Sequence, residues 1–352
     1  MAEVGLQRSV PGLAPAILLR RATSADVPQM VELARIALGQ GSVPRTEGFW
    51  RWKHEQNPFG PSPAMVAETD GKIVSLRIFL RWRWTYGKRA LAAVRPVDTA
   101  THPDWRRRGL FERLTGELLE MMKAEGSAFV FNTPNSISGR GYEKLGWRSV
   151  GRPTIWVRPI RPARVLRRLA RRHEQGRGHE ALQPLEAASA AILSSPDLNG
   201  FLRHTTRRAC RLMTDADAAY LAWRYRDCPG IDYGAAGSFD RISGALVVFR
   251  PVVRRGLREL RLCELLFAED AASRRRMREV IKRLLLEHDA DLATACAVPG
   301  TRQAAILLRS GFLPVPRLGP IIAVRPLGES AVLPPIIRLS AWGATVGDLE
   351  VF

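Results

Sequence analysis

Apolar residues recur at two different spacings along the first 160 residues, and the two spacings alternate. Segments with strand character are short and apolar, and they cover 16–21, 65–68, 73–80, 92–99 and 128–132. Helical spacing of apolar residues follows Thr23, Gly109 and Asn135. Each of these helical patterns begins soon after a strand. The first part of the chain is therefore predicted to be an α/β (α+β) domain, in which helices flank a mixed, mostly antiparallel central sheet.

Aromatic side chains cluster before and within this predicted sheet. The run Phe49-Trp50-Arg51-Trp52-Lys53-His54 ends in the turn Asn57-Pro58-Phe59-Gly60. Trp82, Trp84 and Tyr86 alternate, as they would on one face of an extended strand. We expect the aromatic residues of the first run to pack a helix against the sheet; stacking on a substrate is the alternative.

The loop between the strand at 92–99 and the next helix has the composition of an anion site. It contains Arg106, Arg107, Arg108 and Gly109, and the apolar residues of the helix begin at Leu110. A strand that turns into a helix aims free backbone N–H groups and the positive end of the helix dipole at one point. A pyrophosphate binds well there, and glycine lets the backbone approach it closely. The alternative is a basic, solvated helix start.

The second half of the chain repeats features of the first. The run 220–225 followed by Cys228-Pro229-Gly230 resembles the aromatic run 49–54 and its turn. Val298-Pro299-Gly300 followed by Ser310-Gly311-Phe312 matches the spacing of Thr133-Pro134-Asn135 and Leu145-Gly146-Trp147. Strands at 245–249 and 260–267 precede a helix at 272–287, but no glycine opens that helix. We infer a duplication whose second copy is a poor phosphate site.

Two segments of the first copy resemble motifs of the GCN5-related N-acetyltransferase (GNAT) superfamily. Arg106-x-x-Gly109-x-Phe111 is similar to the coenzyme-A-binding pattern and departs from it at Phe111, where a small residue is usual. Gly141-Tyr142-Glu143-Lys144-Leu145-Gly146-Trp147 is similar to the end of a GNAT domain, with Trp147 in place of Phe. The resemblance covers 16–157. It implies two tandem GNAT-like domains.

On this basis we divide the chain into five segments. They are a flexible leader (1–15), a GNAT domain with an acetyl-CoA site (16–157), a basic linker (158–204), a degenerate GNAT-like domain (205–330) and a tail (331–352).

The resemblance also implies where acetyl-CoA binds and which group protonates its leaving thiolate. In the family, a splayed pair of strands holds the thioester and the pantetheine arm, and a tyrosine at the place of Tyr142 serves as the general acid. The expected cofactor-binding residues are Val97, Thr99, Arg106, Arg107, Arg108, Gly109, Leu110, Phe111 and Asn135. The candidate general base is Asp98 on the splayed strand, with Glu68 and His102 as alternatives.

The net charge and the cysteine content exclude few classes of function. The chain has 352 residues and a net charge of +20 at pH 7, mostly through arginine. This charge would suit an acidic partner, or it reflects a preference for arginine codons. The Arg-rich segment 161–172 could rest on an anionic surface; the alternative is that its apolar stripe packs on a neighbouring domain. Cys210, Cys228, Cys263 and Cys296 are widely spaced, which argues against zinc and disulfides and suits a reducing cytoplasm. No apolar run is long enough for a transmembrane helix and no signal peptide is present, so we expect a cytoplasmic protein.

The sequence therefore predicts an acetyl-CoA-dependent N-acyltransferase that acts on an amine of a small molecule, an amino sugar or a peptide. Tandem domains also occur in transferases that use aminoacyl-tRNA, and the charge would suit tRNA. We favour acetyl-CoA over nucleic acid because the first copy retains a usable phosphate loop. A non-catalytic protein that binds coenzyme A is the third alternative.

Overall fold

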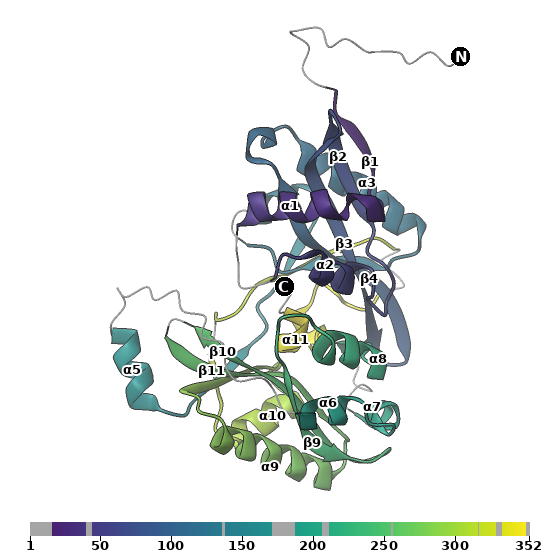
Figure 1. The fold of residues 1–352 in the computed structure, drawn as a ribbon. Helices are drawn as coiled ribbons and strands as arrows, with labels where there is room; N and C mark the ends of the chain where they lie inside the picture. Colours follow the sequence, from purple (N-terminus) through teal and green to yellow (C-terminus); the bar gives the residue numbers. More distant parts are fainter. Residues whose placement is uncertain are drawn as a thin grey trace, which may run out of the picture.

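The computed structural model describes residues 16–39, 44–135, 138–170, 187–205, 211–254, 256–315, 317–328 and 333–349. The predicted leader, part of the predicted linker and the last three residues of the tail lie outside these ranges. Figure 1 shows two α/β units, the first in purple and blue and the second mainly in green. Each unit is built on a mixed sheet, so the predicted fold class is confirmed.

The first sheet has the strand order β1-β2-β3-β4-β5-β14-β6, with β8 paired to the far end of β3. Its pairs are antiparallel except for β4 with β5. The strands are β1 (Leu18–Arg21), β2 (Ala64–Thr69), β3 (Lys72–Tyr86), β4 (Arg89–Thr101), β5 (Phe129–Asn132), β6 (Arg148–Gly151), β8 (Leu212–Thr214) and β14 (Ile322–Pro326).

The second sheet has the order β13-β7-β12-β11-β10-β9, and here β11 and β12 are the parallel pair. Its strands are β7 (Ile155–Pro159), β9 (Gly234–Phe239), β10 (Gly244–Arg254), β11 (Leu257–Phe267), β12 (Leu292–Cys296) and β13 (Leu313–Val315). The parallel pair thus occupies a corresponding place in both sheets, as a duplication predicts.

Strands cross between the two sheets: β7 joins the second sheet, and β14 and the short β8 from the later half of the chain join the first. β7 follows the first unit in sequence but pairs with β12 and β13 of the second sheet. β14 comes from the end of the second unit and pairs with β5 and β6 of the first sheet. The continuous ranges 16–157 and 205–330 therefore do not coincide with the two sheets. β7 and β14 each pair with a strand on both edges, and these pairings satisfy their backbone hydrogen-bonding groups.

Helices cover the outer face of each sheet and fill the space between the two units. The helical segments are η1 (Ser24–Asp26), α1 (Val27–Leu38), α2 (Glu47–His54), η2 (Pro103–Trp105), α3 (Leu110–Ala124), α4 (Gly139–Lys144), α5 (Pro162–Ala170), α6 (Ala187–Leu193), α7 (Leu198–His204), α8 (Ala218–Leu221), the π-helix η4 (Ala222–Arg226), α9 (Ala271–Glu287), α10 (Arg302–Arg309), η6 (Leu339–Ala341) and α11 (Val346–Leu349). The apolar stripe of α3 packs on one face of the first sheet, against Phe79, Val94 and Val130. α9 and α10 cover the second sheet in the same way.

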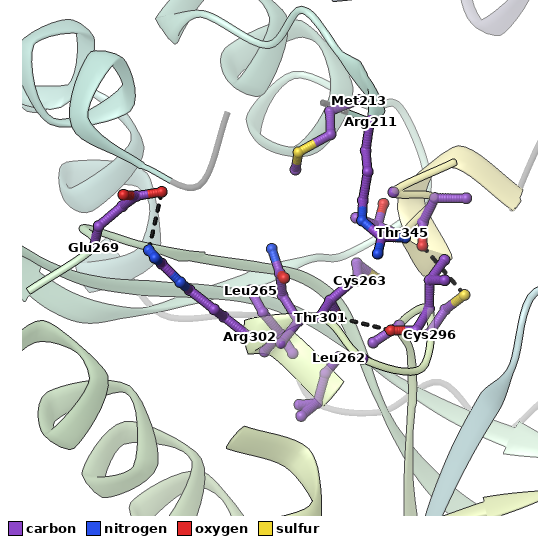
Figure 2. Close-up of a pocket in the computed structure, with 16 residues that line it drawn as sticks. Arg211, Met213, Leu262, Cys263, Leu265, Glu269, Cys296, Thr301, Arg302 and Thr345 are labelled. Carbon is purple, nitrogen blue, oxygen red and sulfur yellow. Dashed lines mark hydrogen bonds and ion pairs between the residues drawn. The ribbon is translucent and has the colours of Figure 1, made fainter. Parts of the chain in front are cut away.

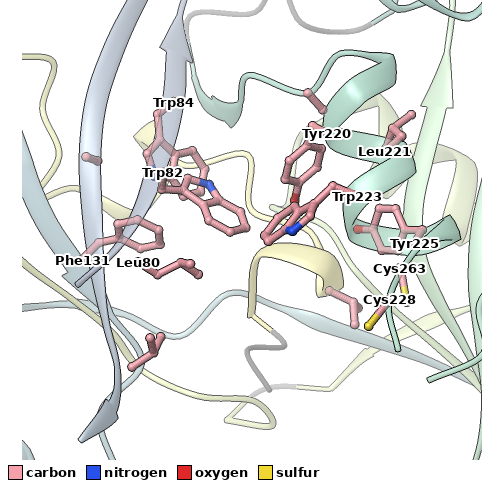
Figure 3. Close-up of a cluster of buried hydrophobic side chains, with 14 of the residues drawn as sticks. Leu80, Trp82, Trp84, Phe131, Tyr220, Leu221, Trp223, Tyr225, Cys228 and Cys263 are labelled. Atoms are coloured by element: carbon pink, nitrogen blue, oxygen red, sulfur yellow. The ribbon is translucent and has the colours of Figure 1, made fainter. Parts of the chain in front are cut away.

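The largest cluster of buried apolar residues joins the two units. Figure 3 shows Trp82, Trp84 and Phe131 of the first sheet facing Tyr220 and Trp223 from the second half of the chain. Successive side chains of β3 point to opposite faces of the sheet. Ile78 and Leu80 therefore lie in the cluster between the two units, whereas Phe79 lies in the cluster under α3. The predicted aromatic run on α2 packs into the same cluster, so its tryptophans are core residues.

Candidate active site

The parallel strands β4 and β5 pair over a short distance and then separate. Their ladder contains the pairs Ala93–Phe129 and Val94–Val130, and beyond it a cleft of about 1080 Å³ opens. The register of β4 against β3 also shifts between Leu76 and Ile78, which places a bulge at Asp98 and Thr99. Most of the predicted site residues line this cleft: Val97, Asp98, Thr99, Arg106, Arg107, Gly109, Leu110, Phe111, Asn135 and Tyr142.

The arginine loop lines the cleft and leads into α3. Arg107 has φ 62° and Gly109 has φ 69°, so the chain twice enters the left-handed region just before the helix. Gly109 is the N-cap of α3, and a Cβ placed there would meet no atom within 4 Å. Glycine is therefore favoured at this position by the backbone conformation and not by lack of space, since the space beside Gly109 is open. Alternating backbone conformations of this kind gather N–H groups around a concave site for anions.

The three arginines of this loop have different surroundings. Arg106 and Arg107 line the cleft, and Arg106 also donates to the carbonyl oxygen of Ala37 over 3.4 Å. Arg108 instead places its guanidinium 4.4 Å from the ring centroid of Trp105. The structure therefore brings two of the three predicted arginines to the cleft.

Tyr142, on α4, also lines the cleft. Its side chain is buried, and its hydroxyl oxygen accepts a hydrogen bond from Nη2 of Arg77 over 2.9 Å. Phe111 packs edge-on against it, with 5.4 Å between ring centroids. Asn135 caps the same helix region, because its Oδ1 accepts from the backbone N–H of Ser138. Tyr142 and the arginine loop thus border one continuous cleft.

Asp98 is held by two cationic or ionisable partners on α2. Its Oδ2 lies 2.6 Å from Nζ of Lys53 and 3.0 Å from Nε2 of His54. Burial acts to raise the pKa of Asp98, but the charge of Lys53 and the hydrogen bond from His54 outweigh burial and hold the pKa well below its usual range. Burial lowers the pKa of Lys53 and of His54, against the opposing pull of Asp98. Asp98 is therefore an ionised group and a weak proton acceptor.

The two alternative bases lie away from this cluster. Glu68 forms an ion pair with Arg20, whose other partner is Asp26. His102 accepts from the backbone N–H of Asp104 at the start of η2, which is a turn role. Neither residue is among those that line the cleft.

Sequence reasoning missed two buried arginines beside the cleft. Arg77 on β3 and Arg95 on β4 are both fully or almost fully buried. Arg95 donates to the backbone oxygens of Asp348 and Leu349 and to Oγ1 of Thr133, so it ties α11 to the cleft wall. Burial lowers the pKa of Arg95 to about 9. The signal for both was an arginine inside an apolar strand, as in Leu76-Arg77-Ile78 and Val94-Arg95-Pro96.

The second unit has a smaller pocket in the corresponding place. β11 and β12 pair as far as Leu262–Ala295, and a pocket of about 320 Å³ follows. Figure 2 shows that Arg302 points across this pocket to Glu269, with Cys263 and Cys296 in its wall. The helix that follows, α9, is capped by Asp270, whose Oδ1 accepts from the backbone N–H of Ser273. A carboxylate at that helix start disfavours a phosphate, which supports the expectation of a poor coenzyme site.

Other predicted interactions can be placed only in part. In α5, Arg164 lies 3.4 Å from Asp291, whereas Leu166 is 66% exposed. Arg171 and Arg172 lie outside the described residues. Among the helices that the structure describes, none is long and apolar enough to cross a membrane. Within the same ranges, no cluster of His, Cys, Asp and Glu has the makeup of a metal site.

The candidate site thus combines a separating parallel pair of strands, an anion loop and a buried tyrosine around one cleft. Residues 19–150 match the family model described as an acetyltransferase (GNAT) domain. The match covers the first unit and confirms the predicted resemblance to the GCN5-related N-acetyltransferases. The match supports acyl transfer as the general class of reaction. A search of curated proteins finds no significant match.

Solved structures share the fold over most of the chain. A GCN5-related N-acetyltransferase from Anabaena variabilis aligns with a TM-score of 0.62 and 13% identity, over 89% of this chain and 73% of its own. Another from Kribbella flavida gives 0.56 and 14%, over 89% and 71%. Eis1 from Mycobacterium abscessus gives 0.56 and 13%, over 92% and 76%. At these identities the comparison shows a common architecture that includes both units.

Proposed function

We propose that this protein is an acetyl-CoA-dependent N-acetyltransferase, with a single working site in the cleft of the first unit. The observation that carries the proposal is the shape of that cleft, which joins an anion loop to a buried tyrosine through a gap between two strands. A long donor with phosphates at one end and a thioester at the other fits such a cleft. The acceptor would be an amine of a small molecule, an amino sugar or a peptide.

The residues present suit acetyl-CoA. The backbone N–H groups of Gly109, Leu110 and Phe111, at the start of α3, would bind the pyrophosphate. The side chains of Arg106 and Arg107 would add charge-assisted hydrogen bonds. The separated edges of β4 and β5 would pair with the amide groups of the pantetheine arm, as a third strand would. Acetyl-CoA supplies the activated acetyl group when it is bound.

The chain then has two tasks, to hold the reacting groups together and to move protons. The amine attacks the thioester carbonyl carbon, a C–N bond forms, and the C–S bond breaks with its electron pair on sulfur. Tyr142 would give its hydroxyl proton to that sulfur. Backbone N–H groups at the bulge of β4 would bind the carbonyl oxygen as its negative charge develops.

Asp98 suits an orienting role better than that of a direct base. Both of its hydrogen bonds to Lys53 and His54 use Oδ2, and the residue lines the cleft. We propose that its negative charge draws the amine to the acceptor end of the cleft and orders a water that accepts the amine proton. Its low pKa makes direct proton transfer from the amine unfavourable.

Calorimetry with acetyl-CoA tests the site before any acceptor is known. Gly109→Trp should abolish saturable binding, because it puts a bulky side chain and backbone strain into the phosphate loop. Gly71→Trp is the matched control, since Gly71 has φ 73° and open space but lies in the β2–β3 turn. About one site per chain is expected, lost in the first variant and kept in the second.

An amine screen then tests turnover by the release of free thiol. Transfer to any amine that depends on Gly109 supports the proposal. Absence of acetyl-CoA binding overturns it and would leave the aminoacyl-tRNA alternative to be tested. Binding without transfer to any amine would favour a protein that binds coenzyme A but does not catalyse.

A further inference from the structure

Arg77 is a buried cation without an acidic partner among the residues that the structure describes. It lies in the middle of β3 with 0% of its surface exposed. Its guanidinium donates to Oγ1 of Thr99 and to the hydroxyl oxygen of Tyr142. Within the described part of the chain it forms no ion pair, and its Nε has no hydrogen-bond partner. Burying a cation in this way is destabilising, so packing alone does not explain its presence.

Aromatic faces take the place of the missing carboxylate. The guanidinium carbon lies 4.7 Å from the ring centroid of Phe111, 5.1 Å from that of Tyr142 and 5.5 Å from that of Phe79. The negative face of an aromatic ring stabilises a desolvated cation. The rings of Phe111 and Phe79, together with the ring of Tyr142 itself, therefore stabilise the positive charge of Arg77 beside the phenol hydroxyl without neutralising it.

This arrangement also explains the departure from the coenzyme-A motif at Phe111. A Cβ on residue 141 would lie 2.9 Å from Cε1 of Phe111, so Gly141 leaves room for that ring. Phe111, at the third motif position, therefore packs directly on the backbone of Gly141, the residue before Tyr142. The ring that Gly141 accommodates is the one closest to the guanidinium of Arg77 among the three rings around it.

The hydrogen bond between Arg77 and Tyr142 has only one direction. A guanidinium carries donors and no acceptor, so the phenol oxygen must accept. The hydroxyl proton of Tyr142 is therefore free to point elsewhere, and the residue lines the cleft. When that proton leaves, the phenolate that remains faces a full positive charge.

We propose that Arg77 is a positioning residue for Tyr142, which directs the phenol proton into the cleft and stabilises the phenolate formed when the proton is given to the leaving sulfur. This inference rests on the proposed function, because it assigns a partner to the proton donor of that reaction. Arg77 itself does not touch the reacting atoms.

A double-mutant cycle tests the coupling between the two residues. Arg77→Met removes the charge and keeps much of the volume, and it should lower kcat at least about 10-fold with little change in KM or in acetyl-CoA affinity. In a Tyr142→Phe background the same change should cost less than about 2-fold. Arg77→Lys should recover part of kcat. Arg81→Met, on the same strand, is the control and should retain activity.

A second measurement separates failure of this inference from failure of the proposed function. The chain has five tyrosines, so a sample labelled with ¹³C at the tyrosine Cζ gives a simple spectrum. The resonance absent in Tyr142→Phe should shift in Arg77→Met, whether or not any amine is acetylated. An unmoved resonance, or equal losses of kcat in both backgrounds, overturns the inference. A wild-type protein that acetylates nothing overturns the proposed function, and the spectrum then decides the contact between Arg77 and Tyr142 by itself.

Discussion

Trp52 and Trp223 bind each other reciprocally, each indole N–H donating to the other's backbone carbonyl oxygen over 2.8 Å. Their rings are stacked with 5.2 Å between centroids. The two residues occupy matching positions in the aromatic runs of α2 and of α8–η4. The contact is therefore self-complementary, as at the interface of a symmetric dimer, but it lies within one chain. It fastens the two units through buried hydrogen bonds.

Loss of either indole N–H should weaken this contact measurably. Trp52→Phe or Trp223→Phe leaves a buried carbonyl oxygen without its donor and should lower the free energy of unfolding by about 1–3 kcal/mol. Urea denaturation of each variant measures the loss. Trp147→Phe is the matched control, because the Nε1 of this buried tryptophan has no hydrogen-bond partner among the residues that the structure describes. A larger loss in the control would show that ring volume, and not the reciprocal bonds, dominates.

Removing the hydroxyl of Tyr142 should affect chemistry more than binding. In Tyr142→Phe the leaving sulfur has no positioned proton donor, so kcat should fall about 10²- to 10⁴-fold. Acetyl-CoA affinity, measured by calorimetry, should stay close to that of the wild type. Unchanged turnover on a good amine would remove Tyr142 from the mechanism.

The carboxyl group of Glu264 should make stability depend on pH. Burial, together with the nearby charge of Asp348, raises its pKa from 4.5 to about 8. Between these two pH values the carboxyl group is protonated in the folded state and ionised in the unfolded state. The contribution of Glu264 to the free energy of unfolding is therefore complete below about pH 4.5 and is lost as the pH rises to about 8. The loss is at most about 1.4 kcal/mol per pH unit. Urea denaturation across this range should show a flatter profile for Glu264→Gln, which keeps an acceptor for the hydroxyl of Tyr225. Parallel profiles would contradict the raised pKa.

The exchange of β7 and β14 should prevent the first unit from folding by itself. A fragment of residues 1–160 lacks β14, which leaves β5 and β6 without the strand between them, and its own β7 has no second sheet to join. Circular dichroism and thermal unfolding should show no cooperative transition for this fragment. Co-expression with residues 161–352 should restore one. A fragment that unfolds cooperatively near the temperature of the whole chain would show that the exchange is dispensable.

Local patterns in the sequence were sufficient for most of the fold. The helical spacing after Thr23, the alternation along β3 and the arginine–glycine loop before α3 each depend on a few neighbouring residues, and the structure has the predicted elements there. The loop and Tyr142 lie at one cleft because strand order in this fold brings them together. The partners of Asp98 could not be predicted in this way, since Lys53 and His54 approach it from a helix more than forty residues earlier. Arg77 was missed for the same reason.

What the sequence determined by itself is the identity of the elements, the duplication and the anion loop, because each depends on short-range spacing. Which sheet receives each final strand was decided by tertiary structure alone. Ile155-Trp156-Val157-Arg158-Pro159 and Ile322-Ala323-Val324-Arg325-Pro326 have the same Ile-x-Val-Arg-Pro pattern, so both are equally suited to be strands. The two segments share the same side-chain alternation, and alternation does not say which neighbour supplies the hydrogen bonds. That choice depends on how the two units pack, where the linked tryptophans and the shared core hold the sheets close enough for the strands to cross.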